Sequence, residues 1–143
     1  MAVNRIDLPA HFNFHCTIPI RISDLNYGNH VGNDTVLTLI HEARMQYLAS
    51  LGYTEMNMEG YGMIMSDVAI NFKNEIFYGD TITVGVAAAD LSRAAFNIVY
   101  KLEKDGNDAR KTVAIARTGM VCYDYDRKKI ISLPEKARLK LSQ

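Results

Sequence analysis

Residues 23–51 read SDLNYGNHVGNDTVLTLIHEARMQYLASL, and this stretch decides the fold because it leads from a strand end through a polar turn into one long helix. Apolar side chains recur there at intervals of three or four residues, the spacing of one helix face, at Val36, Ile40, Ala43, Tyr47 and Leu51. Gly52 follows as a typical helix stop. The pattern predicts about five helical turns with one buried face.

The turn before this helix is unusually polar. Within eleven residues it holds six hydrogen-bonding side chains, those of Asp24, Asn26, Asn29, His30, Asn33 and Asp34. The first N–H groups of a helix have no partner inside the helix, so they are available to a ligand in front of it. We therefore predict a functional site at this helix start. The alternative is that these side chains only cap the helix.

Five further segments have the alternating or continuous apolar pattern of strands: residues 12–22, 63–72, 81–89, 94–102 and 111–123. Pro19 cannot donate to a strand ladder, which places the first strand at an edge or at a bulge. The connector 53–62 is expected to contain a short helical turn, and residues 134–141 a short final helix. Short turns between the last strands indicate an α+β fold, with one five-stranded antiparallel sheet and the long helix against its concave side.

Length and composition limit the possible classes of protein. The 143 residues make one domain, spanning residues 1–143. Sixteen basic residues balance sixteen acidic ones, which argues against nucleic acid as a partner. No apolar run is long enough to span a membrane, and the first residues lack the apolar core of a signal peptide. We expect a cytoplasmic protein without membrane contact.

The cysteines and histidines show no metal-binding spacing. Cys16 and Cys122 are too few for a disulfide framework and are predicted to be reduced residues within strands. The four histidines are scattered and form no paired motif. The sequence therefore predicts neither a metal nor another cofactor.

Residues 63–72 are apolar at almost every position. One predicted face carries Ile64, Val68, Ile70 and Phe72, and the other carries Met63, Met65 and Ala69. A strand that is apolar on both faces is expected to be covered on both, and in a domain with one long helix the second cover would come from another subunit. Asp67 lies on the methionine face, where a carboxylate must be hydrogen-bonded by structural partners or belong to a site.

Two motifs resemble a known family. The run R-I-S-D-L-N-Y-G-N-H-V-G-N-D, followed by H-E-A-R in the helix, resembles the signature of hot-dog-fold acyl-CoA thioesterases of the 4-hydroxybenzoyl-CoA thioesterase family, in its small single-domain bacterial form. The run G-M-I-M-S-D-V-A-I-N-F-K-N-E-I-F-Y-G-D resembles the family's second strand and the Gly-Asp that opens its third. The resemblance as a whole extends over nearly the whole chain, from about residue 12 to residue 133.

This resemblance implies a hot-dog fold, in which the five-stranded antiparallel sheet wraps around one long central helix. The resemblance likewise implies metal-independent hydrolysis of an acyl-CoA or acyl-carrier-protein thioester. It also implies a homodimer or a dimer of dimers, with the acyl-CoA tunnel between subunits. Such hydrolysis needs donors for the oxyanion that forms on the thioester oxygen. The backbone N–H groups of Val31, Gly32 and Asn33, at the helix start, are the predicted donors, and Gly32 lets the substrate come close to the backbone.

The proton acceptor is harder to assign. Many members of the family have D-x-D in this loop and use the second aspartate as nucleophile or general base. Here Asp24 keeps the first position, whereas Asn26 occupies the second and cannot take a proton. The groups left as candidates for the base are Asp24, His30, Glu42 and Asp67. His30 ranks high because related thioesterases use His and Asn in this loop, with Asn26 orienting the water or the thioester.

Each of these residues also has a plain structural interpretation. His30 beside a helix start is often a capping or packing residue, and Glu42 on a helix is often an exposed charge. Two functions therefore stay open, a thioesterase and a protein that binds acyl thioesters with little hydrolysis. A hydratase or dehydratase is disfavoured, because the sequence has no second motif that pairs His with a carboxylate.

Overall fold

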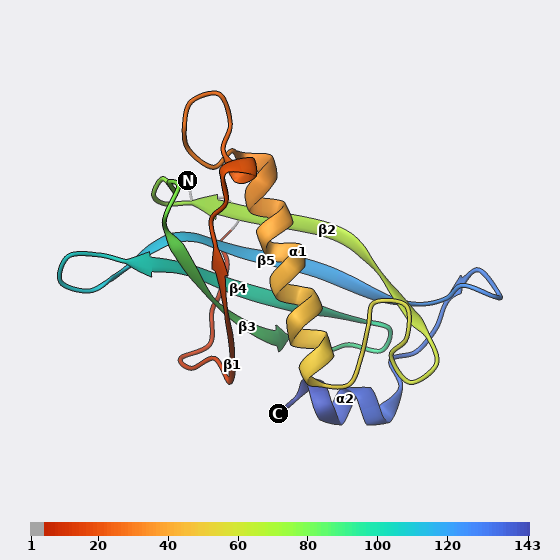
Figure 1. The fold of residues 1–143 in the computed structure, drawn as a ribbon. Coiled ribbons are helices and arrows are strands. Elements are labelled where there is room, and N and C mark those ends of the chain that lie inside the picture. Colours follow the sequence, from red (N-terminus) through yellow and green to blue (C-terminus); the bar gives the residue numbers. More distant parts are fainter. Residues whose placement is uncertain (1–4) are drawn as a thin grey trace.

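One curved antiparallel sheet forms the body of the molecule, and the long helix α1 (Asn33–Ser50) lies against its inner face (Figure 1). The structure is a computed structural model that describes residues 5–143. The strand order is β1-β3-β4-β5-β2, with bounds Phe14–Pro19, Thr81–Ala89, Ala95–Asp105, Arg110–Asp124 and Gly62–Phe72. A two-residue strand, β6 (Lys129–Ile130), adds to β5, and a short helix, α2 (Glu135–Leu141), packs below the end of α1. The predicted α+β architecture with five main strands is confirmed.

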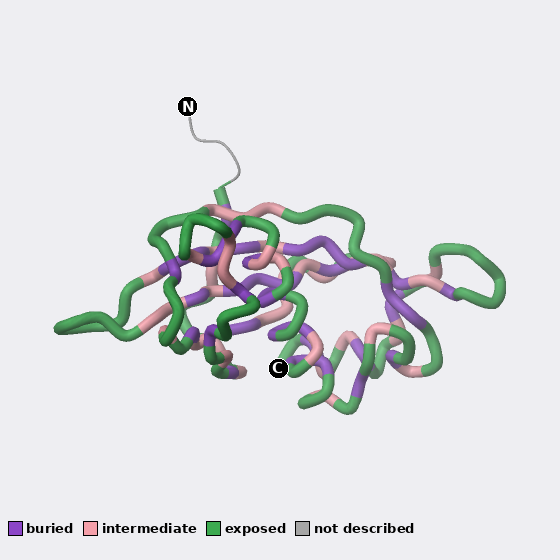
Figure 2. Tube along the Cα trace, turned by 45° about the horizontal axis from the view of Figure 1, so that its top comes forward, coloured by how far each residue is buried: buried purple, intermediate pink, exposed green. Residues whose placement is uncertain are grey.

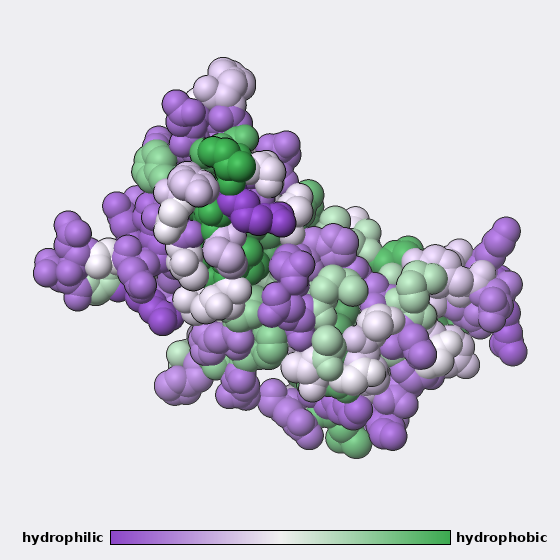
Figure 3. Space-filling model, viewed as in Figure 1, coloured by the Kyte–Doolittle hydropathy of each residue, from purple (hydrophilic) through white to green (hydrophobic). Residues whose placement is uncertain are grey.

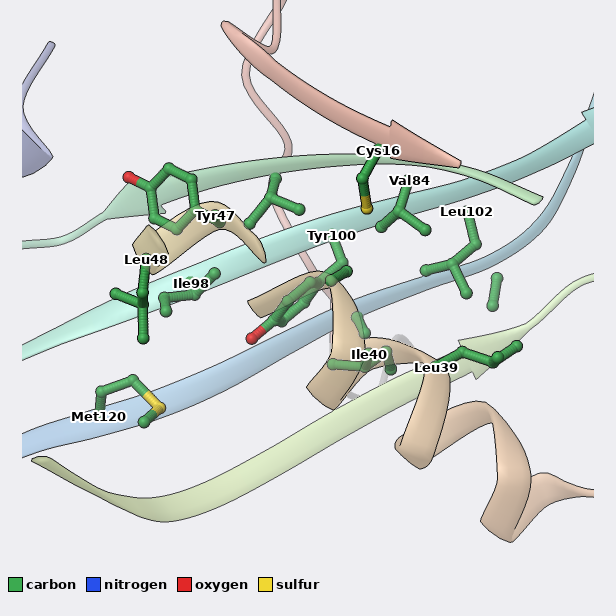
Figure 4. Close-up of a cluster of buried hydrophobic side chains, with 14 of the residues drawn as sticks. Cys16, Leu39, Ile40, Tyr47, Leu48, Val84, Ile98, Tyr100, Leu102 and Met120 are labelled. Carbon is green, nitrogen blue, oxygen red and sulfur yellow. The ribbon is translucent and has the colours of Figure 1, made fainter. Parts of the chain in front are cut away.

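Helix α1 presents its apolar stripe to the sheet, as predicted. Ile40 and Leu48 are fully buried and point toward β3, β4 and β5 (Figure 4). Truncating either side chain to alanine would cost about 2–5 kcal/mol, as is usual at buried aliphatic positions. Helix α1 ends at Ser50, and Gly52 follows with a φ of +83°, which suits glycine better than any other residue. The core thus fixes the direction of α1 and, with it, the position of its N-terminus.

The first strand is shorter than predicted. β1 ends at Pro19, and the Ile20 N–H then donates to the Asp80 carbonyl instead of continuing the ladder. The chain turns into a single 3₁₀ turn, η1 (Ile22–Asp24), where Ile22 is exposed. The edge position predicted from Pro19 is confirmed, since β1 pairs with β3 alone. The strand therefore ends three residues earlier along the chain than the apolar alternation predicted.

A bulge in β2 corrects the predicted assignment of its faces. The register of β2 with β5 shifts between Met65 and Asp67, so that the strand carries one extra residue at Ser66. Met63 and Met65 therefore share the inner face with Val68, opposite Cys122, Met120 and Thr118 of β5. Asp67 lies on the outer face. The strict alternation assumed from the sequence is broken at Ser66. Every residue of β2 after Ser66 therefore lies on the opposite face from the one predicted relative to Met63 and Met65.

β2 is also the exposed edge of the sheet. Ile64, Met65, Val68 and Phe72 are each between 38% and 50% exposed. The expectation that both faces of this strand are covered is not met within a single chain. The reason is geometric, because α1 packs nearest to β1 and β3 at the opposite edge.

The connections are mostly tight turns. The segment between α1 and β2 forms two bridged turns, Thr54 with Asn57 and Met58 with Tyr61, in place of the predicted helical turn. Burial is concentrated in the strands and in the inner side of α1, whereas the loops and hairpin tips are exposed (Figure 2). The two projecting hairpins, β4–β5 and β5–β6, are largely hydrophilic (Figure 3). Neither hairpin approaches the start of α1.

Candidate active site

The loop before α1 is held by its own hydrogen bonds. The Asn26 N–H donates to the His30 carbonyl at 2.9 Å, and the Asn29 N–H donates to the Asn26 carbonyl at 3.1 Å. Asn29 adopts a φ of 66°, a left-handed conformation that asparagine tolerates. The Asn26 Oδ1 accepts the Gly28 N–H at 2.8 Å. The Asn26 side chain therefore stabilises the loop from inside.

The start of the helix lies beside this amide. A Cβ placed on Gly32 would come within 3.4 Å of Asn26 Nδ2 and 2.8 Å of Asp34 Oδ1, so only glycine leaves the backbone uncovered. Among the hydrogen bonds of residues 5–143, none uses the N–H of Gly32 or Asn33. The Val31 N–H is different, because it donates to the Ile76 carbonyl at 2.9 Å. The prediction that Val31 offers a free donor is therefore wrong, and two of the three predicted donors stay available.

His30 lies half-buried at the same place. Its Nδ1 is 3.2 Å from the Val31 carbonyl oxygen. A carbonyl only accepts, so Nδ1 carries the proton in this contact and Nε2 of the neutral ring is left as an acceptor. The imidazole edge also faces Gly28, where a Cβ would lie 3.5 Å from both Cδ2 and Nε2. The loop geometry thus fixes both the tautomer and the direction of the ring.

A pocket of about 230 Å³ opens at this point, and we call it the helix-start pocket. One wall comes from the loop and the first turn of α1. The other comes from the end of β2, the segment that follows it and β5. The lining residues are His30, Val31, Asn33, Val36, Phe72, Lys73, Asn74, Glu75, Ile76 and Val113. His30, Lys73 and Glu75 therefore line one small hollow, together with Asn33, whose backbone N–H is unpaired.

Asp24 lies elsewhere and is buried. Its Oδ2 accepts the Arg21 N–H at 2.8 Å, and its Oδ1 is 3.7 Å from the Arg21 guanidinium. These contacts close the turn η1. Asp24 lines a second pocket of about 260 Å³, between β1 and α1, which does not include His30.

Glu42 lines this second pocket too. Its carboxylate accepts a hydrogen bond from Gln46 Nε2 at 2.8 Å, one turn further along α1. Burial, together with the Glu42 charge, raises the pKa of the nearby Cys16 thiol to about 11. The position of Glu42 on a helix face away from the apolar stripe is as predicted. It is, however, not at the helix start.

Asp67 is on the outer face of the sheet. Its Oδ2 lies 2.6 Å from the Arg117 guanidinium, and more than half of its side chain is exposed. The hydrogen bond from Arg117 lowers the pKa of this carboxyl below its ordinary value. Asp67 also packs directly over Gly119, where no Cβ could fit. Of the two interpretations that the sequence left open, the contacts fit the structural one.

A buried polar network crosses the core behind α1, and the sequence analysis did not detect it. The Arg44 guanidinium is buried, lies 3.2 Å from Glu55 Oε2 and donates to the Tyr100 hydroxyl at 3.3 Å. His41 contacts the other Glu55 oxygen at 2.8 Å, and the Tyr100 hydroxyl is 2.7 Å from Thr118 Oγ1. Burial raises the pKa of the Tyr100 hydroxyl. The charged motif H-E-A-R was the available signal, since an arginine so close to an apolar stripe needs a partner.

An apolar hollow of about 540 Å³ lies beside this network, and we call it the methionine pocket. It is formed by α1, the turn at residues 54–56, the start of β2 and the β5–β6 hairpin. Its lining residues are His41, Met45, Thr54, Glu55, Met56, Met63, Ile64, Met65 and Tyr125. Unbranched thioether side chains adapt to apolar ligands of varied shape. The methionine pocket and the helix-start pocket lie at opposite ends of β2.

Within residues 5–143, no group of three His, Cys, Asp or Glu side chains is arranged to hold a metal ion. No helix in that part of the chain is long and apolar enough to cross a membrane.

Comparison with known proteins places this geometry in a family. The model of the thioesterase-like superfamily matches residues 20–141, which is most of the chain. The chain belongs to the thioesterase-like superfamily. A comparison with curated proteins finds no match.

Solved structures share the fold at low sequence identity. A thioesterase-superfamily protein from Jannaschia sp. CCS1 is 17% identical with a TM-score of 0.83, covering 94% of this chain and 84% of its own. A 1,4-dihydroxy-2-naphthoyl-CoA thioesterase from Synechocystis is 20% identical with a TM-score of 0.80, covering 91% and 96%. A mutant of 4-hydroxybenzoyl-CoA thioesterase, complexed with 4-hydroxybenzoyl-CoA, is 16% identical with a TM-score of 0.81, covering 90% and 97%. The chain therefore has the hot-dog fold expected from its motifs.

Proposed function

We propose that this protein hydrolyses acyl-CoA thioesters, releasing a carboxylic acid and free coenzyme A. One observation supports the proposal: in a chain of the thioesterase-like superfamily, His30 and Asn33 line one pocket, and the backbone N–H groups of Asn33 and of its neighbour Gly32 are unpaired. The structural relatives named above as acyl-CoA thioesterases support coenzyme A as the thiol. An acyl-carrier-protein thioester is the other possible substrate class, since the reacting group is the same.

The chemistry follows from the groups at the helix start. A water molecule attacks the thioester carbon, and negative charge develops on the carbonyl oxygen. The N–H groups of Gly32 and Asn33 stabilise this oxyanion together with the positive end of the α1 dipole, a type of contribution worth about 3–4 kcal/mol per donor. Asn26 holds the loop that presents them. No step requires a metal ion.

A homodimer, or a dimer of dimers, would complete the site. The helix-start pocket and the methionine pocket lie about eight residues apart on β2, which is about 26 Å of extended chain. A short acyl group cannot reach from one to the other within one chain. Antiparallel pairing of β2 with β2 of a second copy would bring the Phe72 end of one strand beside the Met63 end of the other. It would also cover the apolar residues exposed along this edge.

A reducing compartment suits the chain. Both cysteines are free thiols buried in the core. Together with the balanced charge, this supports the cytoplasm, where coenzyme A thioesters are formed and used.

Hydrolysis is tested by following free thiol spectrophotometrically over a panel of straight-chain and aromatic acyl-CoAs. The wild-type protein should release coenzyme A with saturation kinetics. His30→Ala should lower kcat at least about 10-fold, and His11→Ala, which changes an exposed histidine outside the helix-start pocket, should behave like wild type. Tight acyl-CoA binding with thiol release at the background rate would instead favour a binding protein.

The dimer is tested by sedimentation at micromolar concentration. Wild type should sediment as a dimer or a tetramer. Val68→Lys, which puts a charge on the β2 edge, should dissociate it, whereas Leu139→Lys on the exposed side of α2 should not. A stable folded wild-type monomer would contradict this part of the proposal.

A further inference from the structure

The proposed hydrolysis needs a group that accepts the proton of the attacking water, and the carboxylates expected from the sequence are not placed for it. Asp24 is bound to Arg21 in the second pocket, where Glu42 is hydrogen-bonded by Gln46. Asp67 is ion-paired on the outer face of the sheet. None of these three carboxylates lines the helix-start pocket.

Glu75 does line it. It is the single carboxylate among the lining residues of the helix-start pocket, on the wall that faces His30 and Asn33. Its side chain is exposed, and within residues 5–143 its carboxylate has no hydrogen bond or ion pair. A carboxylate with all its lone pairs free can accept a proton from a bound water.

The backbone that carries Glu75 is fixed on both sides. The N–H groups of Lys73 and Asn74 both donate to the Val113 carbonyl, at 2.9 and 3.2 Å, and the Asn74 side chain donates to the Thr112 carbonyl at 2.7 Å. The Glu75 carbonyl accepts Lys104 Nζ at 2.8 Å. These bonds hold the backbone of residues 73–76 in place, and with it the point from which the Glu75 side chain extends.

The segment at residues 73–76 is also hydrogen-bonded directly to the loop before α1. The Ile76 carbonyl, one residue after Glu75, accepts the Val31 N–H at 2.9 Å. That hydrogen bond couples the position of Glu75 to that of the neighbouring Gly32 and Asn33 donors. It also explains why the Val31 N–H is not itself a donor to substrate. The two walls of the pocket are therefore joined by a backbone hydrogen bond.

We infer that Glu75 is the general base of the hydrolysis, and this inference rests on the proposed thioesterase function. The water oxygen bonds to the thioester carbon while one water proton passes to the Glu75 carboxylate. The Nε2 acceptor of His30 holds the other water hydrogen and orients the attack. When the tetrahedral intermediate collapses, the C–S bond breaks and the leaving sulfur takes the proton from Glu75. The carboxylate is restored, and the acid product loses its own proton to solvent.

The test compares Glu75→Gln with the matched control Glu135→Gln, which neutralises an exposed carboxylate on the first turn of α2, outside the helix-start pocket. Glu75→Gln should lower kcat by about 10² to 10⁴ with little change in KM. The acidic limb of the kcat–pH profile should disappear in the residual activity. Glu75→Asp should recover part of the rate, and Glu135→Gln should stay within about threefold of wild type. Equal thermal unfolding midpoints establish that the variants are folded.

The outcomes separate this inference from the proposal on which it rests. If wild type hydrolyses acyl-CoA and Glu75→Gln keeps its kcat and its acidic limb, Glu75 is not the base and the thioesterase proposal stands. If Glu135→Gln lowers kcat as much as Glu75→Gln does, the loss is not specific to the helix-start pocket and the inference is overturned. If wild type releases no thiol from any member of the acyl-CoA panel, both are overturned.

Discussion

Replacing Arg44 by methionine would test whether the buried network behind α1 holds the helix to the sheet. Methionine keeps most of the length and volume of the arginine stem but removes the charge and all five donors. The substitution therefore leaves the Glu55 carboxylate without its buried partner. The Tyr100 hydroxyl keeps one hydrogen bond, to Thr118.

The magnitude follows from the burial of the partners. Removing one member of a buried ion pair costs about 3–5 kcal/mol, because the other charge stays desolvated. Glu55 has 23% of its side chain exposed and keeps its contact with His41, which places the cost at the lower end. We expect Arg44→Met to lower the free energy of unfolding by about 3 kcal/mol, a large share of the 5–15 kcal/mol of a typical domain.

Urea unfolding followed by circular dichroism measures this change, with protein concentration held constant because any association shifts the midpoint. The control is His41→Ala, which removes the exposed contact to the same carboxylate and should cost less than about 1 kcal/mol. Restoring an uncharged partner in the double variant Arg44→Met, Glu55→Gln should recover part of the loss. An Arg44→Met protein within 1 kcal/mol of wild type would refute the role given to the network.

Four other outcomes are expected. Gly32→Ala should leave the unfolding free energy within about 1 kcal/mol of wild type, because the φ of −77° at Gly32 is ordinary for any residue. The added methyl group should nevertheless lower kcat about 10-fold or more in the thiol-release assay, because it covers the oxyanion donors. The Arg117 contact depresses the folded-state pKa of Asp67, so its contribution to stability is present above the unfolded pKa near 4 and is lost as pH falls through the folded value. Because the side chain is largely exposed, Asp67→Asn should cost less than about 1 kcal/mol in urea unfolding at pH 7, and less still as the pH is lowered below the unfolded pKa. Burial raises the pKa of Cys16 and of Cys122 to about 11, so a thiol reagent at pH 7.5 should label neither in the native protein and both in urea, as mass spectrometry would record. Hydrolysis should survive exhaustive treatment with a chelator, and activity that vanished and returned on adding a divalent ion would contradict the metal-independent chemistry.

Local sequence patterns were enough to predict most of the fold. The apolar spacing of Val36, Ile40 and Tyr47 predicted α1 and its buried face, because a helix repeats every 3.6 residues whatever lies around it. Alternation and turn residues predicted β3 to the residue and β4 and β5 closely. The bulge at Ser66 was not predictable, since one extra residue in a uniformly apolar strand leaves no mark in its composition.

The candidate site divides in the same way. The glycines, His30 and Asn26 could be identified from the sequence, because their number at a helix start exceeds what a turn needs and because the motif resembles a family. The sequence could not show which acidic residue lines the same pocket as His30. Asp24 is close to His30 in the chain but lines a different pocket, while Glu75 is 45 residues away and lines the same one.

That choice belongs to the tertiary structure. β2 runs antiparallel along β5 and ends beside the start of α1, where the hydrogen bond from Val31 to Ile76 joins two loops far apart in the chain. Strand pairing and the packing of α1 decide such proximity, and both depend on contacts that no local pattern encodes. The sequence by itself determined the helix, the strands and the donors at the helix start. Only the folded sheet decided which acidic residue, Glu75, lines the pocket at the helix start.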